Sequence, residues 1–293
     1  MENLDNAEHR CICWNGITIN VPNTWEATVA GSHHLHFDCN FQGVMEMRWL
    51  NASSKNIPEL IQSTVRQYQT LTGTKLLQKT VSDSIKKDLL PLQAHRFATE
   101  DKNNGPQLVY LHDQLSSTFV MFQFFRKLSD IQFRRCLKSL QFASADDTCS
   151  TWAIQDFRVR IPQDFRLMNY TMDAGLSTLH FRKVQTGLHI CRLAPAGVRL
   201  RGNTLDEILA SLLDLRDFHP QWEDSGNRVD YARNPGILQQ ISYRLQGKKP
   251  FMAATLRHDS AADRLLGVFM EGIHPLDDQL HHEITASYEI TPV

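Results

Sequence analysis

The sequence predicts an α+β protein made of two tandem copies of one domain, each an antiparallel β-sheet flanked by helices in an α/β/α sandwich. The main observation is repetition: a strand-like segment ending at Pro22 returns before Pro162, 140 residues later. Later matches keep their order while the offset grows to 144 and then 148 residues, as two short loop insertions would produce. Each copy falls within the usual domain size of ~100–200 residues. We therefore expect domains at residues 10–145 and 150–293.

The first expected strand covers residues 17–21. Ile17, Ile19 and Val21 alternate with polar residues, which is the period of a half-buried strand, and Pro22 ends it. Two more strands are expected over residues 35–37 and 44–50, joined by a turn around Gly43.

A helix should follow the third strand in both copies. Asn56 and Glu59 have the spacing of a capping box, and Thr204 and Glu207 repeat that spacing. Apolar residues then recur at helical intervals through Leu71 in the first copy and Leu212 in the second.

A meander of strands and a closing helix complete the copy. Strands are expected near residues 76–81, 92–99 and 108–112, with a hairpin turn at 103–105. The almost continuously apolar stretch 119–125 suits a central strand covered on both faces, so its four phenylalanines are expected in the core. Ser129 should cap the closing helix.

The order of elements and a few short motifs resemble the fold superfamily of the photosystem II protein PsbP, the Ran-binding import regulators and the bacterial DcrB-like proteins. The motifs are Val21-Pro22-Asn-Thr-Trp25 with Leu137-Lys-Ser139-Leu-Gln-Phe142, then Ile161-Pro162-Gln-Asp-Phe165 with Ala286-Ser287-Tyr-Glu-Ile290. The second copy departs from the pattern at Phe165 and at its closing strand. The resemblance implies a non-enzymatic binding module and supplies no catalytic residues.

Composition limits the possible partners and compartment. The 31 basic and 32 acidic residues nearly cancel, which argues against non-specific nucleic-acid binding. From the polar, acidic start of the chain we expect no signal peptide, and no run of ~18 apolar residues would span a membrane. Six scattered cysteines fit a reducing compartment. We expect a cytoplasmic protein.

The densest group of potential metal ligands is the run His33–Cys39. On a strand, His34, His36 and Asp38 would share one face, with His33 and Cys39 off it. The second copy keeps only His180, which excludes a duplicated metal site. A polar strand face is the expected structure, so we predict no metal and no cofactor.

Other catalytic patterns are weak. The sequence lacks the nucleophile elbow and the glycine-rich phosphate loops. His112-Asp113 and His258-Asp259 each follow an expected strand, where an aspartate usually shapes a turn. His281-His282-Glu283 lacks the histidine spacing of zinc proteases, so a solvated helix face is expected. We predict no catalytic residue.

Four arginines are the candidates for partner binding. Arg48 and Arg192 lie on strands among apolar neighbours in matched segments, where each either extends to solvent, meets a carboxylate within the fold, or binds a partner. Arg199 and Arg201 lie in an insertion, 195–202, expected to be either a mobile binding loop or an extended connector.

The sequence therefore predicts a protein-binding adaptor or accessory subunit of pseudo-dimeric architecture, with a pseudo-twofold contact between its two repeats and another protein as its partner. One alternative is a chaperone or adaptor for a secreted effector, which needs an exposed apolar groove. The other is a metal-dependent enzyme that uses the His33–Cys39 run.

Overall fold

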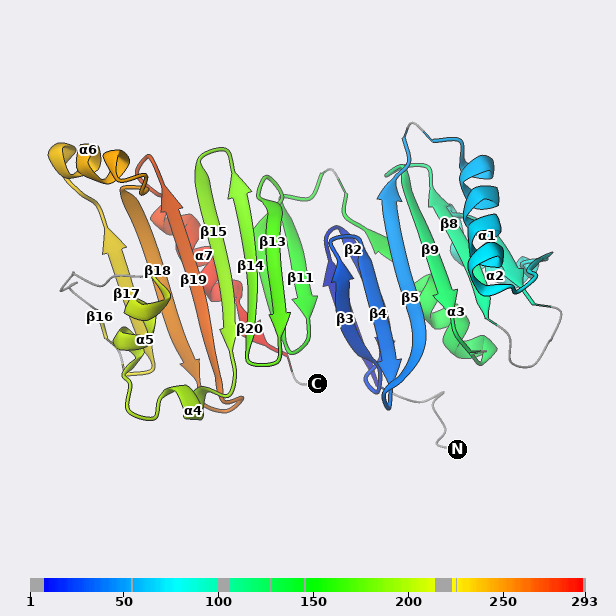
Figure 1. Cartoon of the computed structure of the whole chain (residues 1–293), viewed down its shortest axis with the longest axis horizontal. Helices are drawn as coiled ribbons and strands as arrows, with labels where there is room; N and C mark the ends of the chain where they lie inside the picture. The colour runs from blue at the N-terminus through cyan, green and yellow to red at the C-terminus, as the bar shows by residue number, and fades with distance from the viewer. Residues whose placement is uncertain are drawn as a thin grey trace. The chain divides into compact units, whose positions relative to one another are not determined.

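The computed structural model describes residues 8–53, 55–99, 106–126, 128–144, 146–213, 223–224 and 226–291 (Figure 1). They form an α+β protein that is rich in antiparallel strands. The chain divides into two compact units. The first contains residues 1–147 and 152–155, and the second contains 148–151 and 156–292. Trp152–Gln155 thus groups with the first unit, although it follows residues 148–151 of the second.

The first unit is organised around a seven-stranded sheet in which each strand is antiparallel to its neighbours. Its strands, in spatial order, are β3 (Glu26–Gly31), β4 (His34–Cys39), β5 (Gln42–Asn51), β9 (Thr118–Phe124), β8 (Gln107–Asp113), β7 (Gln93–Ala98) and β6 (Leu77–Lys79).

Beside this sheet lies a smaller set of strands with the order β10-β2-β1-β11, of which only the end of β11, from Trp152 on, belongs to the first unit. Strand β2 (Ile17–Pro22) pairs with β1 (His9–Trp14) and with the two-residue β10 (Gln141–Phe142), while β1 also pairs with β11 (Cys149–Ile154). Trp14 is fully buried there, and its ring meets that of Trp152 edge-on at 5.2 Å. This contact explains why residues 152–155 belong to the first unit.

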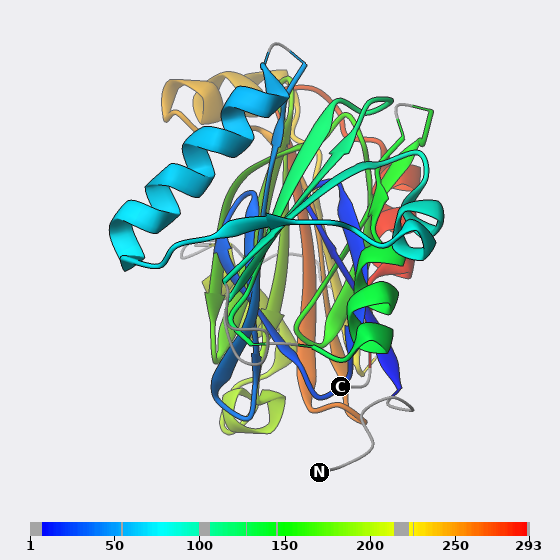
Figure 2. The same ribbon diagram turned by 90° about the vertical axis from the view of Figure 1, so that its right-hand side faces the viewer.

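Helices cover both faces of the seven-stranded sheet of the first unit (Figure 2). Helix α1 (Ile57–Thr72) packs Ile61 and Val65 against a cluster that includes Tyr110 and Phe119. On the opposite face, Phe133 of α3 (Asp130–Lys138) packs against Phe124 at 5.4 Å between ring centroids. A short helix, α2 (Asp83–Leu89), lies between β6 and β7.

The second unit has a seven-stranded antiparallel sheet with the same order of equivalent strands. The strands are β13 (Arg166–Asp173), β14 (Leu176–Lys183), β15 (Thr186–Leu193), β19 (Arg264–Gly272), β18 (Phe251–Asp259), β17 (Arg228–Arg233) and β16 (Glu223–Asp224). Beside them, β12 (Phe157–Pro162) pairs with β20 (Glu289–Ile290).

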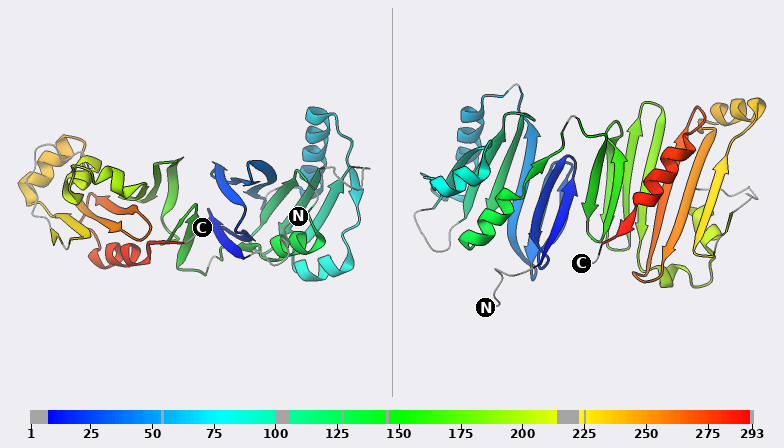
Figure 3. Two further views of the ribbon diagram at one scale, coloured as in Figure 1. Left: turned by 90° about the horizontal axis from the view of Figure 1, so that it is seen from below. Right: turned by 180° about the vertical axis from the view of Figure 1, so that it is seen from behind.

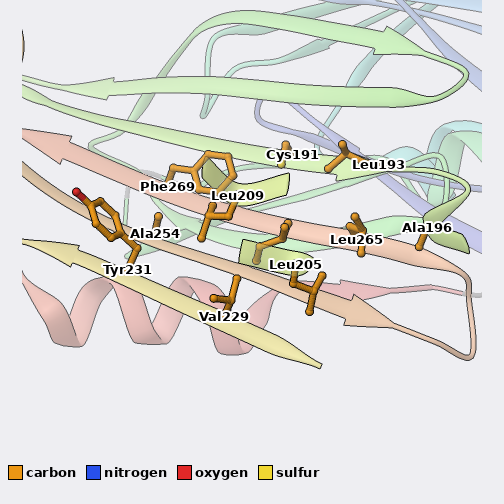
Figure 4. Close-up of a cluster of buried hydrophobic side chains, with 11 residues drawn as sticks. Cys191, Leu193, Ala196, Leu205, Leu209, Val229, Tyr231, Ala254, Leu265 and Phe269 are labelled. Carbon is orange, nitrogen blue, oxygen red and sulfur yellow. The ribbon is translucent and has the colours of Figure 1, made fainter. Parts of the chain in front are cut away.

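The core of the second unit lies under α5 (Leu205–Leu212). Leu205 and Leu209 pack with Val229 and Phe269 from the sheet (Figure 4). The other face carries α7 (Asp278–Ser287), visible across the strands when the unit is seen from behind (Figure 3). The short helix α4 (Ala196–Arg199) follows β15.

The two units differ most in two connections. In the first unit, residues 80–92 join β6 to β7 and contain α2, whereas only 225–227 join β16 to β17. In the next connection the difference is reversed: eight residues (99–106) separate β7 from β8, but seventeen (234–250) separate β17 from β18 and contain α6 (Ile237–Leu245). Each unit therefore has a helix that the other lacks among the described residues.

Several expected elements are confirmed and others were missed. Asn56 accepts a hydrogen bond from the Glu59 N–H at 3.4 Å, and the Thr204 N–H donates to Glu207 at 2.8 Å. Three of the four phenylalanines of 119–125 are buried, while Phe125 is half-buried. The expected hairpin turn at 103–105 lies outside the described residues. Sequence analysis missed strands β1, β3, β11 and β13 and helices α2 and α6.

Candidate functional site

Helix α6 is the most unusual surface element of the second unit, because its apolar side faces solvent. It begins after Gly236, which follows Asn234-Pro235, and the chain turns out of it through Gly247, which has a φ of 70°. Glycine adopts this left-handed conformation without the strain that a side chain would bring. The helix lies at the edge of the sheet where β17 ends and β18 begins (Figure 1).

The polar side of α6 holds it to the rest of the unit. Only Gln240 and Tyr243 are half-buried within the helix. The Arg233 guanidinium lies 4.5 Å from the centre of the Tyr243 ring, a cation–π contact, and also donates hydrogen bonds to the carbonyls of Lys249 and Pro250 at 2.7 and 2.9 Å. Arg244 donates to the Ile273 carbonyl at 3.0 Å. The helix is thus fixed through polar contacts.

Four large apolar side chains form the opposite side, which we call the α6 stripe. Leu238 and Leu245 are 83% and 84% exposed, and Ile237 and Ile241 are 77% and 49% exposed. Their spacing of one, four and eight residues from Ile237 places them along one face of the helix. A surface helix normally turns such a face to the core. The exposed stripe is therefore a candidate binding surface.

The surroundings of the α6 stripe are basic. Residues 233–249 contain four basic side chains and no aspartate or glutamate. Lys249 forms an ion pair with Glu271 at 2.8 Å. Arg233 and Arg244 donate to neutral carbonyl oxygens, and these contacts do not neutralise their positive charge. An apolar stripe beside basic side chains favours a partner with apolar and acidic groups.

The expected polar face of the His33–Cys39 run is present in β4. Leu35, Phe37 and Cys39 are buried, whereas His34, His36 and Asp38 are half-buried on the opposite side. His36 Nε2 lies 3.0 Å from Asp38 Oδ1. Glu46 of β5 completes this cluster, 3.5 Å from His36 Nδ1 and 3.6 Å from His34 Nε2. Within the described residues, no group of three or more His, Cys, Asp or Glu side chains is arranged to hold a metal ion.

A different histidine cluster occupies the equivalent strands of the second unit. His180 of β14 lies opposite His189 of β15, as His36 lies opposite Glu46, and the two Nδ1 atoms are 2.9 Å apart. Glu271 of β19 lies 3.6 Å from His189 Nε2. The neighbouring His189 and the Lys249 ion pair lower the pKa of Glu271 to about 2 despite its partial burial. Burial, followed by the nearby His189, lowers the pKa of His180.

The structure places the two strand arginines in different environments. Arg48 is half exposed, donates to Glu46 at 3.1 Å and lies opposite His34. Arg192 is buried and bonds to Asp156, whose second partner is Arg264 at 2.8 Å. Arg192 thus meets a carboxylate within the fold, which leaves it unavailable for the partner contact that the sequence also allowed.

The apparent equivalence of Arg48 and Arg192 is also corrected. A β-bulge between Phe37 and Asp38 shifts the pairing of β4 with β5 by one residue. Arg48 therefore occupies the place of Cys191, and Trp49 occupies that of Arg192.

The insertion 195–202 is not an extended connector. Residues 196–199 form α4, held by hydrogen bonds from the backbone N–H groups of Ala196 and Gly197 to Asp263. Arg199 donates to the Gly175 carbonyl at 3.2 Å, and Arg201 is exposed. Arg48, Arg199 and Arg201 are thus the exposed members of the four predicted arginines, and Arg192 is the buried one.

The two His-Asp pairs lie at strand ends and their carboxylates shape turns, as expected. Asp113 accepts hydrogen bonds from the Leu115 and Ser116 N–H groups at 3.3 and 2.9 Å. Asp259 accepts one from the Ala262 N–H at 3.0 Å. By contrast, His281 does not lie on a solvated face: its Nε2 is 3.2 Å from the Val268 carbonyl oxygen, and burial lowers its pKa.

Sequence analysis missed the α6 stripe and the His180–His189 pair. The signal for the stripe was present, because residues 237–245 combine apolar residues at helical spacing with a surrounding segment that has no acidic residue. Periodicity alone does not tell which side of a helix is covered. The histidine pair gave no local signal, since its members come from separate strands.

Comparison with known proteins does not assign a family. No family model matches the chain, and no curated protein matches it. Solved structures of MucB match over most of the chain: MucB in complex with MucA(peri) is 10% identical and covers 97% of this chain and 87% of its own, with a TM-score of 0.22. MucB alone is 12% identical over 96% and 84% of the two chains, and the MucA/MucB complex of Pseudomonas aeruginosa is 9% identical over 97% and 87%, both with TM-scores of 0.20. Scores this low assign neither fold nor function to this chain.

Proposed function

We propose that this chain is a non-enzymatic protein-binding module that engages its partner through the α6 stripe. The observation that carries the proposal is the inverted orientation of α6, with polar side chains toward the unit and Ile237, Leu238, Ile241 and Leu245 toward solvent. Removing such side chains from water on binding contributes roughly 25 cal/mol per Å² of apolar surface, which offsets part of the entropic cost of association.

The chemistry of the surface defines the class of partner. Four basic residues and no acidic residue between 233 and 249 favour a protein segment that presents apolar side chains with aspartate or glutamate beside them. An amphipathic acidic helix laid along the stripe has this composition. Raised ionic strength should weaken the complex, because salt screens the contribution of the exposed charges.

The two-copy architecture is part of the proposal. The same strand order in the two seven-stranded sheets, together with the repeated sequence segments, supports a tandem duplication. The resemblance to the PsbP-like superfamily and the pseudo-twofold packing of the copies remain predictions. Among the described residues, α6 occurs in the second copy only, so the proposed binding surface belongs to that copy.

An affinity-capture experiment from the native host tests this function with paired variants. The bait is the full chain, and the test variant is Leu238→Asp with Leu245→Asp. The control is Leu115→Asp, which changes a side chain that is 87% exposed in the first unit. We expect a protein captured by the wild type and the control to be lost from the test variant and weakened by salt.

Two outcomes would contradict the proposal. One is the same set of captured proteins for the wild type and the α6 variant. The other is a wild-type chain that sediments with anionic phospholipid vesicles but loses this binding in the α6 variant, which would make the stripe a membrane-contact surface. Among the described residues, no helix is long and apolar enough to cross a membrane.

A further inference from the structure

The His180–His189 pair has the geometry of two cis ligands of a metal ion. The imidazoles project from adjacent strands β14 and β15, directly opposite each other, and their Nδ1 atoms are 2.9 Å apart. Two nitrogens at about 2.0 Å from one ion are about 2.8 Å apart at a 90° angle and about 3.3 Å apart at a tetrahedral angle. The observed separation fits the 90° angle of a tetragonal site better.

We propose that His180 and His189 form a binding site for a divalent transition-metal ion that prefers tetragonal coordination. Among such ions, Cu²⁺ should bind most tightly. Imidazole nitrogen suits Cu²⁺, and the Irving–Williams order places Cu²⁺ highest among the divalent first-row ions. Binding of one ion by both Nδ1 atoms requires that each neutral imidazole carry its proton on Nε2.

Glu271 lies next to the nitrogen of His189 that would not bind the ion. Its Oε1 lies 3.6 Å from His189 Nε2, the nitrogen that does not face His180. A carboxylate that accepts the distal N–H of a ligating histidine fixes its tautomer and orients the ring. Lys249 holds Glu271 in turn at 2.8 Å. Glu271 is therefore a positioning residue rather than a ligand.

The site is accessible, and protein side chains fill only two of the coordination positions around the ion. The His189 side chain is 32% exposed, so solvent or a small ligand can fill the remaining positions around the ion. With two protein ligands the site should take up added metal without retaining it through purification. This expectation differs from the sequence prediction of no metal, which rested on the His33–Cys39 run of the other unit.

The first unit provides a matched internal control. His36 occupies the position of His180, but its neighbour across the strand pair is Glu46 instead of a second imidazole. The site should therefore exist in one unit of each chain. His36→Gln removes an equivalent histidine while leaving the proposed ligands unchanged.

Titration of the full chain with CuCl₂ tests the proposal, with calorimetry for affinity and electron paramagnetic resonance for ligand identity. We expect one strong equivalent with two imidazole nitrogens, retained in His36→Gln and lost in both His180→Gln and His189→Gln. Glu271→Gln should weaken affinity by about 10–100-fold. Circular dichroism verifies that each variant is folded, and the two ligand variants alter the site from different strands.

Strong copper binding that survives in His180→Gln and His189→Gln would overturn the proposal. The same conclusion would follow if His36→Gln abolished the strong equivalent, or if the spectra of the wild type showed no coordinated imidazole.

Discussion

Ser287 Oγ accepts a hydrogen bond from the backbone N–H of Arg160 at 3.0 Å, joining the closing helix α7 to strand β12. Ser139 receives the same bond from the Asn20 N–H at 2.9 Å in the first unit. Each serine hydroxyl also donates to a carbonyl three residues earlier in its helix, at 2.8 Å. One hydroxyl thus connects two elements in the same way in both units.

Replacing either serine by alanine should lower the free energy of unfolding by about 1 kcal/mol, the usual contribution of one such hydrogen bond. Ser63→Ala is the matched control, because the Ser63 hydroxyl donates only to the Leu60 carbonyl within its own helix. Urea denaturation measures the three values. A Ser287→Ala variant as stable as Ser63→Ala would show that the bridge contributes nothing.

The Asp156 group should be essential for the stability of the second unit. Arg192 and Arg264 both bond to this carboxylate, and Arg192 is buried. Asp156→Asn leaves the Arg192 charge buried without its counterion, which typically costs about 3–5 kcal/mol. Urea denaturation of the variant measures the loss, and a change below about 1 kcal/mol would contradict this account.

The contribution of Asp156 should also depend on pH. Burial opposes its ionisation, but hydrogen bonds from Arg192 and Arg264 outweigh that effect and lower the pKa of the folded state. The stabilisation is therefore fully present above the unfolded pKa of about 3.9 and is lost as pH falls through the lower folded value. The stability difference between the wild type and Asp156→Asn should narrow below about pH 4. A difference independent of pH would refute this linkage.

Two leucines on helices that follow each other in the chain should differ in how much their truncation lowers stability. Leu209 of α5 is fully buried, so Leu209→Ala should destabilise the second unit by about 2–5 kcal/mol. Leu245 of α6 is 84% exposed, so Leu245→Ala should change stability by less than about 0.5 kcal/mol. Thermal denaturation compares them. A large loss at Leu245 would mean that the α6 stripe is covered within the chain.

The contact between Trp14 and Trp152 predicts where the first unit can be cut. A fragment of residues 1–155 keeps the edge-on packing of these rings, whereas 1–147 removes Trp152 and uncovers the buried Trp14. We expect the shorter fragment to melt at a lower temperature and to bind more hydrophobic dye. Equal melting temperatures would show that residues 152–155 add nothing to this unit.

Elements with strong local signals were predictable from the sequence. The capping residues at Asn56 and Thr204 located the starts of α1 and α5, and the prolines at 22 and 162 ended β2 and β12. Strand β3 was missed because its less exposed positions hold only the small residues Ala27, Val29 and Gly31, which give a weak apolar signal.

The candidate sites were predictable only in part, because they depend on pairing between strands. The bulge beside Phe37 moves Arg48 out of the position of Arg192, and an ungapped comparison of the two segments does not show this shift. A one-residue change in register alters which face and which neighbour each side chain meets. The partner of His180 likewise becomes apparent only when β14 and β15 are paired.

In the function proposed above, the presence of α6 between β17 and β18, and its absence from the described part of the equivalent connection, set the number of partners that one chain binds. A chain with two copies of a domain could in principle engage two partner molecules and gain avidity. With a single α6 stripe, each chain should bind one partner, so the complex should saturate at a one-to-one ratio.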